Sequence, residues 1–259
     1  MGMSYSIDIC VNATSQVRGP EVFWMSRWED WIDLVFPVFV LRSAVNTVVI
    51  NTGLPADMAA LADSWEAYMG GAQGRPVRGA EQTLDAHLKR LGIAAADVDT
   101  VILTPLQAYT VGGVEAFANA RICMSRAGWA AFCAPRLKTA HAARAAAIPD
   151  ETLNYLNTEA WDRVELLDDE QEILPGLRAT RVGGHHPESG IVWVETARGT
   201  VAITDVAFHY DNVEKHIPLG VAEDMEEIAH AYDLLRRSGA IVLPAYDPVR
   251  LAAYADGKL

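Results

Sequence analysis

The chain has 259 residues, of which 51% are hydrophobic, so it can bury a large core in one domain or in two fused half-domains. Its formal net charge of -13 would repel phosphate backbones and anionic lipid surfaces, which excludes nucleic-acid and membrane-surface roles. The three cysteines are an odd number without C-x-x-C spacing, which argues against a disulfide framework or a thiolate zinc site.

The first distinctive segment is FWMSRWEDW, residues 23–31. Trp24, Trp28 and Trp31 recur at i, i+4 and i+7, which would align them on one face of a helix. Such a face is a core stripe, a contact in a possible homodimer, or a wall of an apolar pocket. The third alternative makes Trp28 a candidate substrate-binding residue.

The next elements alternate between strand and helix signals. Residues 36–41 and 46–50 are β-branched and apolar, as in two paired strands. Leucines at i, i+4 and i+7 followed by glycine predict a helix over 82–91. A strand at 99–103 then leads into TPLQAYTVGG, residues 104–113, which has the position of a loop at the mouth of an active site.

The second half shows the same alternation. Residues 127–160 are rich in alanine and predict helices interrupted at Pro135 and Pro149. Two layers of strands, each covered by helices, are the most economical arrangement, and we expect an α+β fold. The remaining predicted elements are a short helix at 115–117, strands at 121–124, 164–167 and 177–182, a hairpin of 191–196 with 200–204, a helix at 222–237 and a strand at 240–243.

Neither a transmembrane segment nor an export signal is predicted. The sequence contains no uncharged apolar run of about 18 residues, and MGMSYSIDIC has no basic flank before an apolar stretch. We therefore expect a soluble, cytoplasmic protein.

Five stretches together resemble the metallo-β-lactamase superfamily, in its N-acyl homoserine lactonase-like branch. They are VVINTG (48–53), LKRLGIAAADVDTVILTPLQAYTVGGVEAFANARICMSRAGW (88–129), GGHHPES (183–189), TDVAFHYDNVEKHIPLG (204–220) and LPAYDP (243–248). The resemblance implies an αββα sandwich of two similar halves, formed by residues 1–259 as a single domain, with the active site where strand ends of both halves meet.

The resemblance also shows which metal ligands are missing. In the family's Thr-His-x-His-x-Asp-His motif, the ligand positions fall on Pro105, Gln107, Tyr109 and Thr110. The third-motif histidine and the bridging aspartate survive as His185 and Asp205, whereas the last histidine falls on Tyr246. Asn51 replaces the usual aspartate of DTG, and Phe208 replaces a tyrosine that assists the lactonases.

Two remaining ligands should not hold zinc tightly, because zinc sites need three or four nitrogen, sulfur or carboxylate donors. Proline offers no donor atom, and a phenol keeps its proton to about pH 10. The sequence therefore predicts neither a metal site nor another cofactor. A rebuilt site can be drawn as an alternative, from His185, His186, Glu188, Asp205 and His209.

A metal-free site could work by acid–base chemistry. Asp205 would accept one imidazole N–H of His185 and so make the other nitrogen a general base, while Tyr109 would donate to a developing oxyanion. Thr104 or Thr110 is an alternative nucleophile. The competing interpretation is that His185 and Asp205 are relics and that Tyr109 only packs. Residues expected to line the substrate pocket are Tyr246, Gln107, Thr110, Phe208, His209 and Trp28.

The leading hypothesis is a metal-independent hydrolase for a small cyclic or aromatic carbonyl compound, such as a lactone, ester or amide. Two alternatives remain open. One is an isomerase, lyase or cyclase that works by proton transfer, and the other is a catalytically inactive protein that binds a small molecule.

Overall fold

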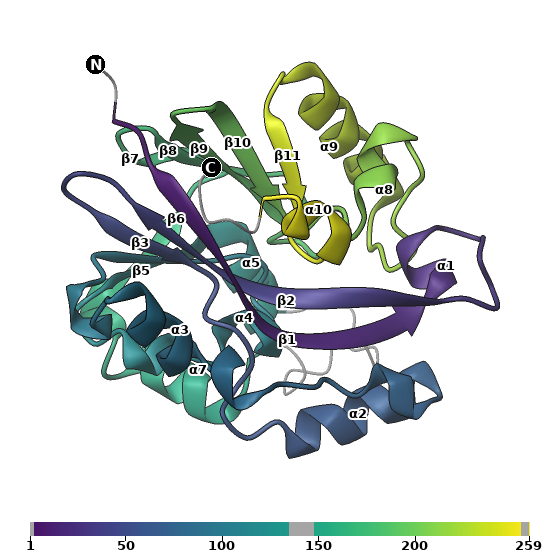
Figure 1. The fold of residues 1–259 in the computed structure, drawn as a ribbon, viewed down its shortest axis with the longest axis horizontal. Helices are drawn as coiled ribbons and strands as arrows, with labels where there is room; N and C mark the ends of the chain where they lie inside the picture. Colours follow the sequence, from purple (N-terminus) through teal and green to yellow (C-terminus); the bar gives the residue numbers. More distant parts are fainter. Residues whose placement is uncertain (1–2, 135–147, 255–258) are drawn as a thin grey trace.

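A computed structural model describes residues 3–134, 148–254 and 259 of the chain. Two β-sheets pack face to face, and helices cover the outer side of each sheet (Figure 1). This is the predicted αββα arrangement.

The first sheet has six strands in the order β1-β2-β3-β4-β5-β6. β1 and β2 form a long antiparallel hairpin, and β3 pairs antiparallel with β2, while β3 to β6 run parallel. The bounds are β1 Ser6–Arg18, β2 Trp31–Arg42, β3 Thr47–Ile50, β4 Thr100–Leu103, β5 Arg121–Ser125 and β6 Val164–Leu167.

The second sheet has five strands in the order β11-β10-β9-β8-β7. β7 to β10 are antiparallel neighbours, and β10 pairs parallel with β11. The bounds are β7 Glu170–Leu174, β8 Leu177–Arg181, β9 Gly190–Thr196, β10 Gly199–Thr204 and β11 Ile241–Pro244.

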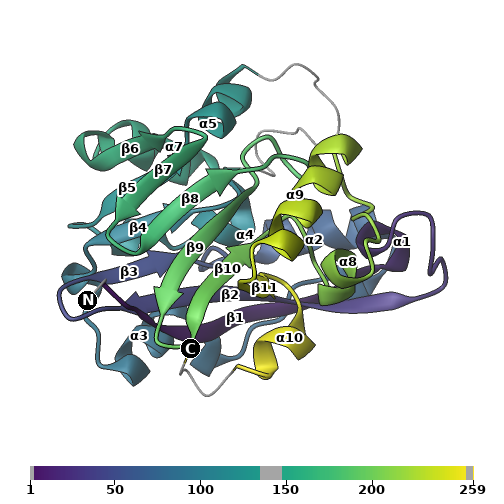
Figure 2. The same cartoon turned by 90° about the horizontal axis from the view of Figure 1, so that it is seen from above.

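The helices fall into two outer layers, as the two views show (Figures 1 and 2). α3 and α7 lie on the first sheet, and α8 and α9 lie beside the second. The bounds are α1 Gly19–Val22, α2 Ala59–Met69, α3 Leu84–Leu91, α4 Ala108–Val111, α5 Arg126–Cys133, α7 Asp150–Asn157, α8 Tyr210–Glu214, α9 Met225–Arg237 and α10 Pro248–Ala252, with short 3-10 turns η1 Ala72–Gly74, η2 Ala80–Gln82, η3 Ala95–Asp97, η4 Val114–Ala116 and η5 Trp161–Arg163.

The first sheet is buried on both faces, which explains its continuous apolar strands. In β2, Phe39 and Leu41 point into the core between the sheets, whereas Val38 and Val40 pack under the outer helices. All four side chains are fully buried. Alternate residues of β2 therefore pack into two separate hydrophobic cores, one on each face of the first sheet.

Most predicted elements are present within a few residues of their expected bounds, and the structure adds helices that were not predicted, of which α2 is the longest. β1 and β7 were not predicted, although SIDICVNATSQVR alternates apolar and polar residues through most of its length, as strands do. The predicted helix over 23–31 is wrong: α1 ends at Val22, and Trp31 begins β2. The break at Pro135 lies outside the described residues, whereas Pro149 directly precedes α7.

Candidate functional site

The carboxyl ends of four strands meet at one edge of the sandwich. Asn51 follows β3, Thr104 follows β4, Asp205 follows β10, and Tyr246 lies two residues beyond β11. β3 and β4 run parallel, as do β10 and β11, so each sheet delivers two chain segments to this edge. Side chains that are far apart in the sequence are brought together here.

Asn51 fixes the start of the loop that follows β4. Its side-chain amide donates to the Thr104 carbonyl at 2.9 Å and accepts from the Thr104 N–H at 2.9 Å. An aspartate could not make the first of these bonds, because an ionised carboxylate only accepts. The substitution noted in the sequence thus contributes a structural bond.

The hydroxyl of Thr110 is committed to the same loop. It donates to the Pro105 carbonyl at 2.5 Å, lies 2.8 Å from the Gln107 carbonyl, and accepts from the Gln107 N–H. Gln107 itself is the residue before α4. These contacts leave Thr110 as a structural residue of the loop and remove it as a candidate nucleophile.

Asp205 is fully buried and accepts hydrogen bonds from three donors. They are the Thr104 hydroxyl at 3.1 Å, the Gly190 N–H at 3.0 Å and the Ser189 hydroxyl. Burial raises the pKa of Asp205, and the bonds from Ser189 and Gly190 oppose that rise. The carboxylate therefore ties Thr104, which follows β4, to the loop before β9, and the Thr104 hydroxyl that it holds is buried.

The predicted hydrogen bond between His185 and Asp205 is absent. Nδ1 of His185 lies 2.7 Å from the carbonyl oxygen of Val221, so Nδ1 must carry the proton because a carbonyl only accepts. Nε2 then has the lone pair, and it has no hydrogen-bond partner among the described residues. Burial and the charge of His186 lower the pKa of His185 well below its ordinary value. The backbone carbonyl of Val221, rather than Asp205, sets the tautomer.

Aromatic rings fill the space beside His185. The Phe208 ring packs edge-on against His185 with centroids 4.9 Å apart, and Tyr246 packs against Phe208 at 4.8 Å. Tyr109 meets Tyr246 at 5.8 Å, and Phe36 from β2 contacts both tyrosines. Trp65 of α2 completes the set at 5.2 Å from Phe36 and 6.0 Å from Tyr109. We call Phe36, Trp65, Tyr109, Phe208 and Tyr246 the aromatic cluster.

The two phenols of the aromatic cluster are protonated. Burial raises the pKa of both tyrosines far above 10, and the negative charges of Asp205 and Glu188 raise it further. The Tyr246 hydroxyl is buried and has no hydrogen-bond partner of normal geometry in the described part of the chain. Tyr109 is partly exposed. The Tyr109 phenol is close enough to raise the pKa of Tyr246, but the two groups do not make a hydrogen bond of normal geometry, so the Tyr246 hydroxyl is left without a partner.

A second imidazole accompanies His185. The His186 ring lies over that of His185 with centroids 3.9 Å apart, and its Nδ1 is 3.1 Å from Glu223 Oε1. Burial lowers the pKa of His186, but the hydrogen bond to Glu223 and the charge of Glu188 outweigh it and raise the pKa above its ordinary value. Glu188 is buried, accepts from the Leu106 N–H at 3.0 Å, and has its own pKa raised by burial.

The other predicted lining residues have local roles. His209 precedes α8, and its Nδ1 accepts from the Asp211 N–H at 3.1 Å. Its ring contacts Phe23 at 5.3 Å rather than the aromatic cluster. Trp28 is 59% exposed in the segment between α1 and β2 and makes no ring contact with the cluster in residues 3–134, 148–254 and 259. Trp28 is therefore outside the assembled site.

The donors at this edge do not fit a zinc centre. Asp205 has both oxygens engaged, His185 offers one nitrogen, and the neighbouring phenols hold their protons. In the part of the chain that the structure describes, no group of three or more His, Cys, Asp or Glu side chains is placed to hold a metal ion. The alternative rebuilt site is thus not assembled.

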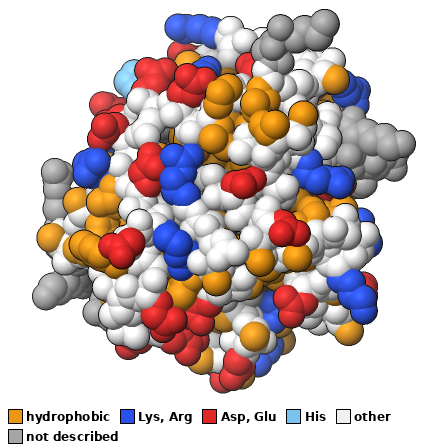
Figure 3. Space-filling view, turned by 90° about the vertical axis from the view of Figure 1, so that its left-hand side faces the viewer, with side chains coloured by type: hydrophobic (Ala, Val, Ile, Leu, Met, Phe, Trp, Pro, Cys, Tyr) orange, Lys and Arg blue, Asp and Glu red, His pale blue; other side chains and the backbone are white. Residues whose placement is uncertain are grey.

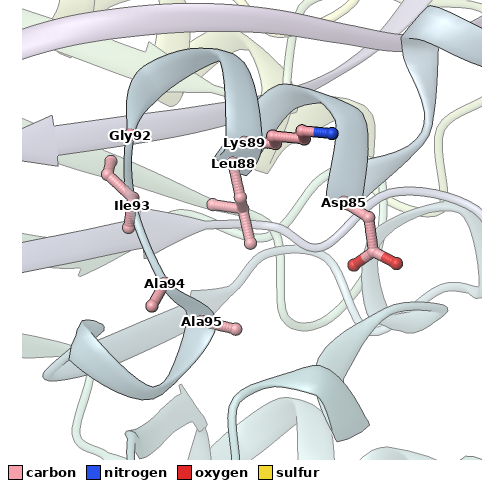
Figure 4. A pocket seen from close by; sticks show the side chains of 7 residues that line it. All are labelled: Asp85, Leu88, Lys89, Gly92, Ile93, Ala94 and Ala95. Carbon is pink, nitrogen blue, oxygen red and sulfur yellow. The ribbon is translucent and has the colours of Figure 1, made fainter.

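Two cavities lie away from the aromatic cluster. One of about 30 Å³ lies between the ends of β4 and β9 and is lined by Thr104, Glu188 and Arg181, among others. It is large enough for one water molecule. The other, about 410 Å³, is a surface groove beside the end of α3 and includes Leu88 and Ile93 (Figure 4).

Sequence reasoning missed Phe36, Trp65 and Ser189 as members of the site. Phe36 belongs to a strand with continuous burial and Trp65 to a helix that was not predicted, so neither had a local signal. Ser189 follows Glu188 in GGHHPES, a stretch that was already recognised. The sequence does not show that the Ser189 hydroxyl contacts the buried carboxylate of Asp205.

Comparisons with known proteins identify remote relatives. No protein-family model matches the chain. An N-acyl homoserine lactonase from Bacillus cereus is 22% identical over 229 residues, which is 80% of this chain and 85% of that protein. Another from Bacillus sp is 23% identical over 189 residues, 72% of this chain and 70% of that protein.

Solved structures give the same result for the fold. An N-acyl homoserine lactone hydrolase with N-hexanoyl-L-homoserine at its catalytic metal centre has a TM-score of 0.75 at 18% identity, covering 98% of this chain and 97% of that one. A probable metal-dependent hydrolase from Staphylococcus aureus has a TM-score of 0.75 at 16% identity, covering 95% and 91%. The resemblance to lactonases of the metallo-β-lactamase superfamily is confirmed, and the chain has their fold.

Proposed function

We propose that the chain is a metal-independent hydrolase that acts on a small, activated lactone or ester. In this proposal Nε2 of His185 is the general base, and the phenols of Tyr246 and Tyr109 stabilise the oxyanion. Asp205 holds the loops in place and does not orient the imidazole. The remote likeness to lactonases supports the class of substrate, and residues 1–259 would act as one domain.

One observation carries the proposal: a buried base and a buried acid lie without partners within the same group of rings. The carbonyl of Val221 forces the lone pair of His185 onto Nε2, and Phe208 separates this ring from the unpartnered hydroxyl of Tyr246. An unmade hydrogen bond at a buried atom costs about 1–3 kcal/mol. Two such atoms on either side of the Phe208 ring suit a ligand that displaces this ring and supplies both partners.

The chemistry follows from the protonation states. Nε2 would remove a proton from a water molecule as that water attacks the carbonyl carbon, and the phenols would donate hydrogen bonds to the oxygen that becomes negative. When this intermediate collapses, the bond from carbon to the leaving oxygen breaks, and the imidazolium returns its proton to that oxygen. The pKa of His185 is low, so it is neutral and ready to accept a proton at pH 7, but it is a weak base. A weak base without Lewis-acid assistance requires a substrate with a good leaving group.

The test is hydrolysis of an activated lactone and an aryl ester by protein purified with and without a chelator. We expect His185→Ala to lower kcat at least about a hundredfold, because general base catalysis contributes that much. His209→Ala is the matched control, since that ring caps α8 outside the cluster, and its kcat should be unchanged. Equal turnover by His185→Ala, or turnover that follows metal content, would contradict the proposal.

A second candidate, a catalytically inactive small-molecule-binding protein, is supported by the packing of the cluster. Phe208 and Tyr246 are only 7% and 2% exposed, so a substrate must displace rings before it reaches His185. Thermal shifts with lactones that are bound and not hydrolysed, in wild type and in Tyr109→Leu, would favour this candidate.

A further inference from the structure

The segment between α1 and β2 exposes an unusual group of large apolar side chains. Trp24 is 53% exposed, Met25 62% and Trp28 59%. Tryptophan and methionine are enriched in the centres of protein interfaces, and a tryptophan there often contributes much of the binding energy. The segment projects at one end of the long axis of the molecule (Figures 1 and 2). We call residues 24–30 the tryptophan turn.

The tryptophan turn is held firmly at its base. The Gly19 N–H donates to the Asp30 carbonyl at 2.9 Å, and the Trp24 N–H donates to the Pro218 carbonyl at 2.9 Å. The Arg27 guanidinium stacks on the buried Phe23 ring at 3.9 Å. A Cβ atom at Gly19 would lie 2.2 Å from the carbonyl oxygen of Arg27, so the backbone at Gly19 is in direct contact with the backbone at Arg27.

The backbone of the turn is strained at two positions. Met25 has φ 52° and Arg27 has φ 55°, a left-handed conformation that costs a non-glycine residue about 1–2 kcal/mol. Such strain persists only where surrounding contacts impose it, as the hydrogen bonds at the base do. The exposed side chains are therefore presented in a fixed arrangement, and binding through them would cost little ordering entropy.

The charged side chains of the tryptophan turn indicate which kind of partner binds there. Arg27, Glu29 and Asp30 are exposed beside the tryptophans. A two-fold axis places the same patch on both subunits, so the cation of one copy can meet the carboxylates of the other. An anionic lipid surface would offer no cation to Glu29 and Asp30, whereas a second copy offers Arg27. We infer that the tryptophan turn is a self-complementary interface that joins two copies of this chain.

Sedimentation velocity over a wide concentration range tests this inference. Wild type should be a dimer, and Trp24→Ser with Trp28→Ser should be a monomer with an unchanged circular dichroism spectrum. Trp161→Ser is the matched control, because Trp161 is 62% exposed on η5, and it should leave the dimer intact. Wild type that stays monomeric at every concentration, or a dimer that survives the double substitution, would overturn the inference.

Charge reversal tests the two-fold pairing itself. Arg27→Glu should weaken the dimer at least about tenfold, equivalent to about 1.4 kcal/mol. Adding Glu29→Arg to Arg27→Glu should restore most of that loss, because the opposite charges then face each other again. Failure of Arg27→Glu to weaken the dimer would refute the pairing. Flotation of the protein with neutral phosphatidylcholine vesicles would identify the turn as a lipid contact and overturn the inference as well.

Discussion

At the scale of single residues, the site is defined by polar atoms left without partners. Nε2 of His185 and the hydroxyl of Tyr246 are both buried and unpaired in the described residues, whereas the nearby carboxylate of Asp205 is satisfied by three donors. Stability alone would favour an apolar atom at each unpaired position. The unpaired atoms are thus where function and stability conflict.

The conflict predicts the behaviour of Tyr246→Phe. The ring contacts with Phe208 and Tyr109 would remain, and the unpaired hydroxyl would be removed. We expect the free energy of unfolding to rise by about 1 kcal/mol, since the desolvation penalty of the hydroxyl disappears. Turnover of an activated ester should fall at the same time, as commonly happens where activity depends on an unfavourable group. Urea denaturation and ester hydrolysis measure the two effects.

The control for this prediction is Tyr232→Phe. Tyr232 is equally buried, but its hydroxyl donates to the Val206 carbonyl at 3.3 Å and accepts from the Leu219 N–H at 3.2 Å. Removing it should lower stability by about 1 kcal/mol. A Tyr246→Phe variant that loses stability as Tyr232→Phe does would show that the Tyr246 hydroxyl is satisfied in solution.

At the scale of elements, the site depends on how closely α4 docks on the loop after β3. The Gly112 N–H donates to the Gly53 carbonyl at 2.9 Å, and the Thr52 N–H donates to the Thr110 carbonyl. The two backbones touch, with no side chain between them. This contact fixes Tyr109, which lies on α4, against Phe36 and Tyr246.

The docking predicts that Gly112→Ala is severely destabilising. A methyl group there would begin 2.1 Å from the Pro55 nitrogen, and the neighbour is backbone that cannot move aside. We expect a loss of at least about 3 kcal/mol, as in overpacked cores. Gly92→Ala is the control: it meets no atom within 4 Å and, with φ 69°, should cost about 1 kcal/mol. Equal losses of unfolding free energy for Gly112→Ala and Gly92→Ala in urea denaturation would argue against tight docking of α4 on the loop after β3.

At the scale of the whole molecule, the burial of carboxyl groups makes stability depend on pH. Acidic and basic side chains are interspersed on the face shown in Figure 3. Burial raises the pKa of Glu21 to about 7, partly opposed by Arg18, and also raises those of Glu188 and Asp205. Among the described residues, no helix is long and apolar enough to cross a membrane.

Glu21 gives the sharpest prediction of this kind. Its pKa is higher folded than unfolded, so the folded state binds the proton more tightly, and stability falls as pH rises from about 4.5 to about 7. Because Glu21 is partly exposed, the loss should be about 1–2 kcal/mol after solvent screening. Glu21→Gln should therefore gain stability over wild type across this range and keep that gain at pH 8. The prediction would be refuted if the difference in unfolding free energy between wild type and Glu21→Gln were the same at every pH.

The sequence by itself determined the layered arrangement of sheets and helices and the position of the loop that follows β4. Runs of β-branched residues predicted most strands because two-sided burial leaves a strong local pattern, and the resemblance predicted that the loop after β4 and Asp205 follow strand ends, as they do in the structure. The helix predicted for the tryptophan segment failed, because i, i+4, i+7 spacing cannot show that the turn is held open by Phe23, Gly19 and Pro218.

Only the tertiary structure decided what the site contains. The partner of His185 is a backbone carbonyl on a distant loop, and no residue pattern reports where a carbonyl points. Tyr109 lies on α4 after β4 of the first sheet, and Tyr246 follows β11 of the second sheet. Phe36 of β2 and Trp65 of α2 meet them from two further elements. Ring contacts and unpaired atoms depend on how distant elements pack, whereas local patterns record only burial and backbone preference.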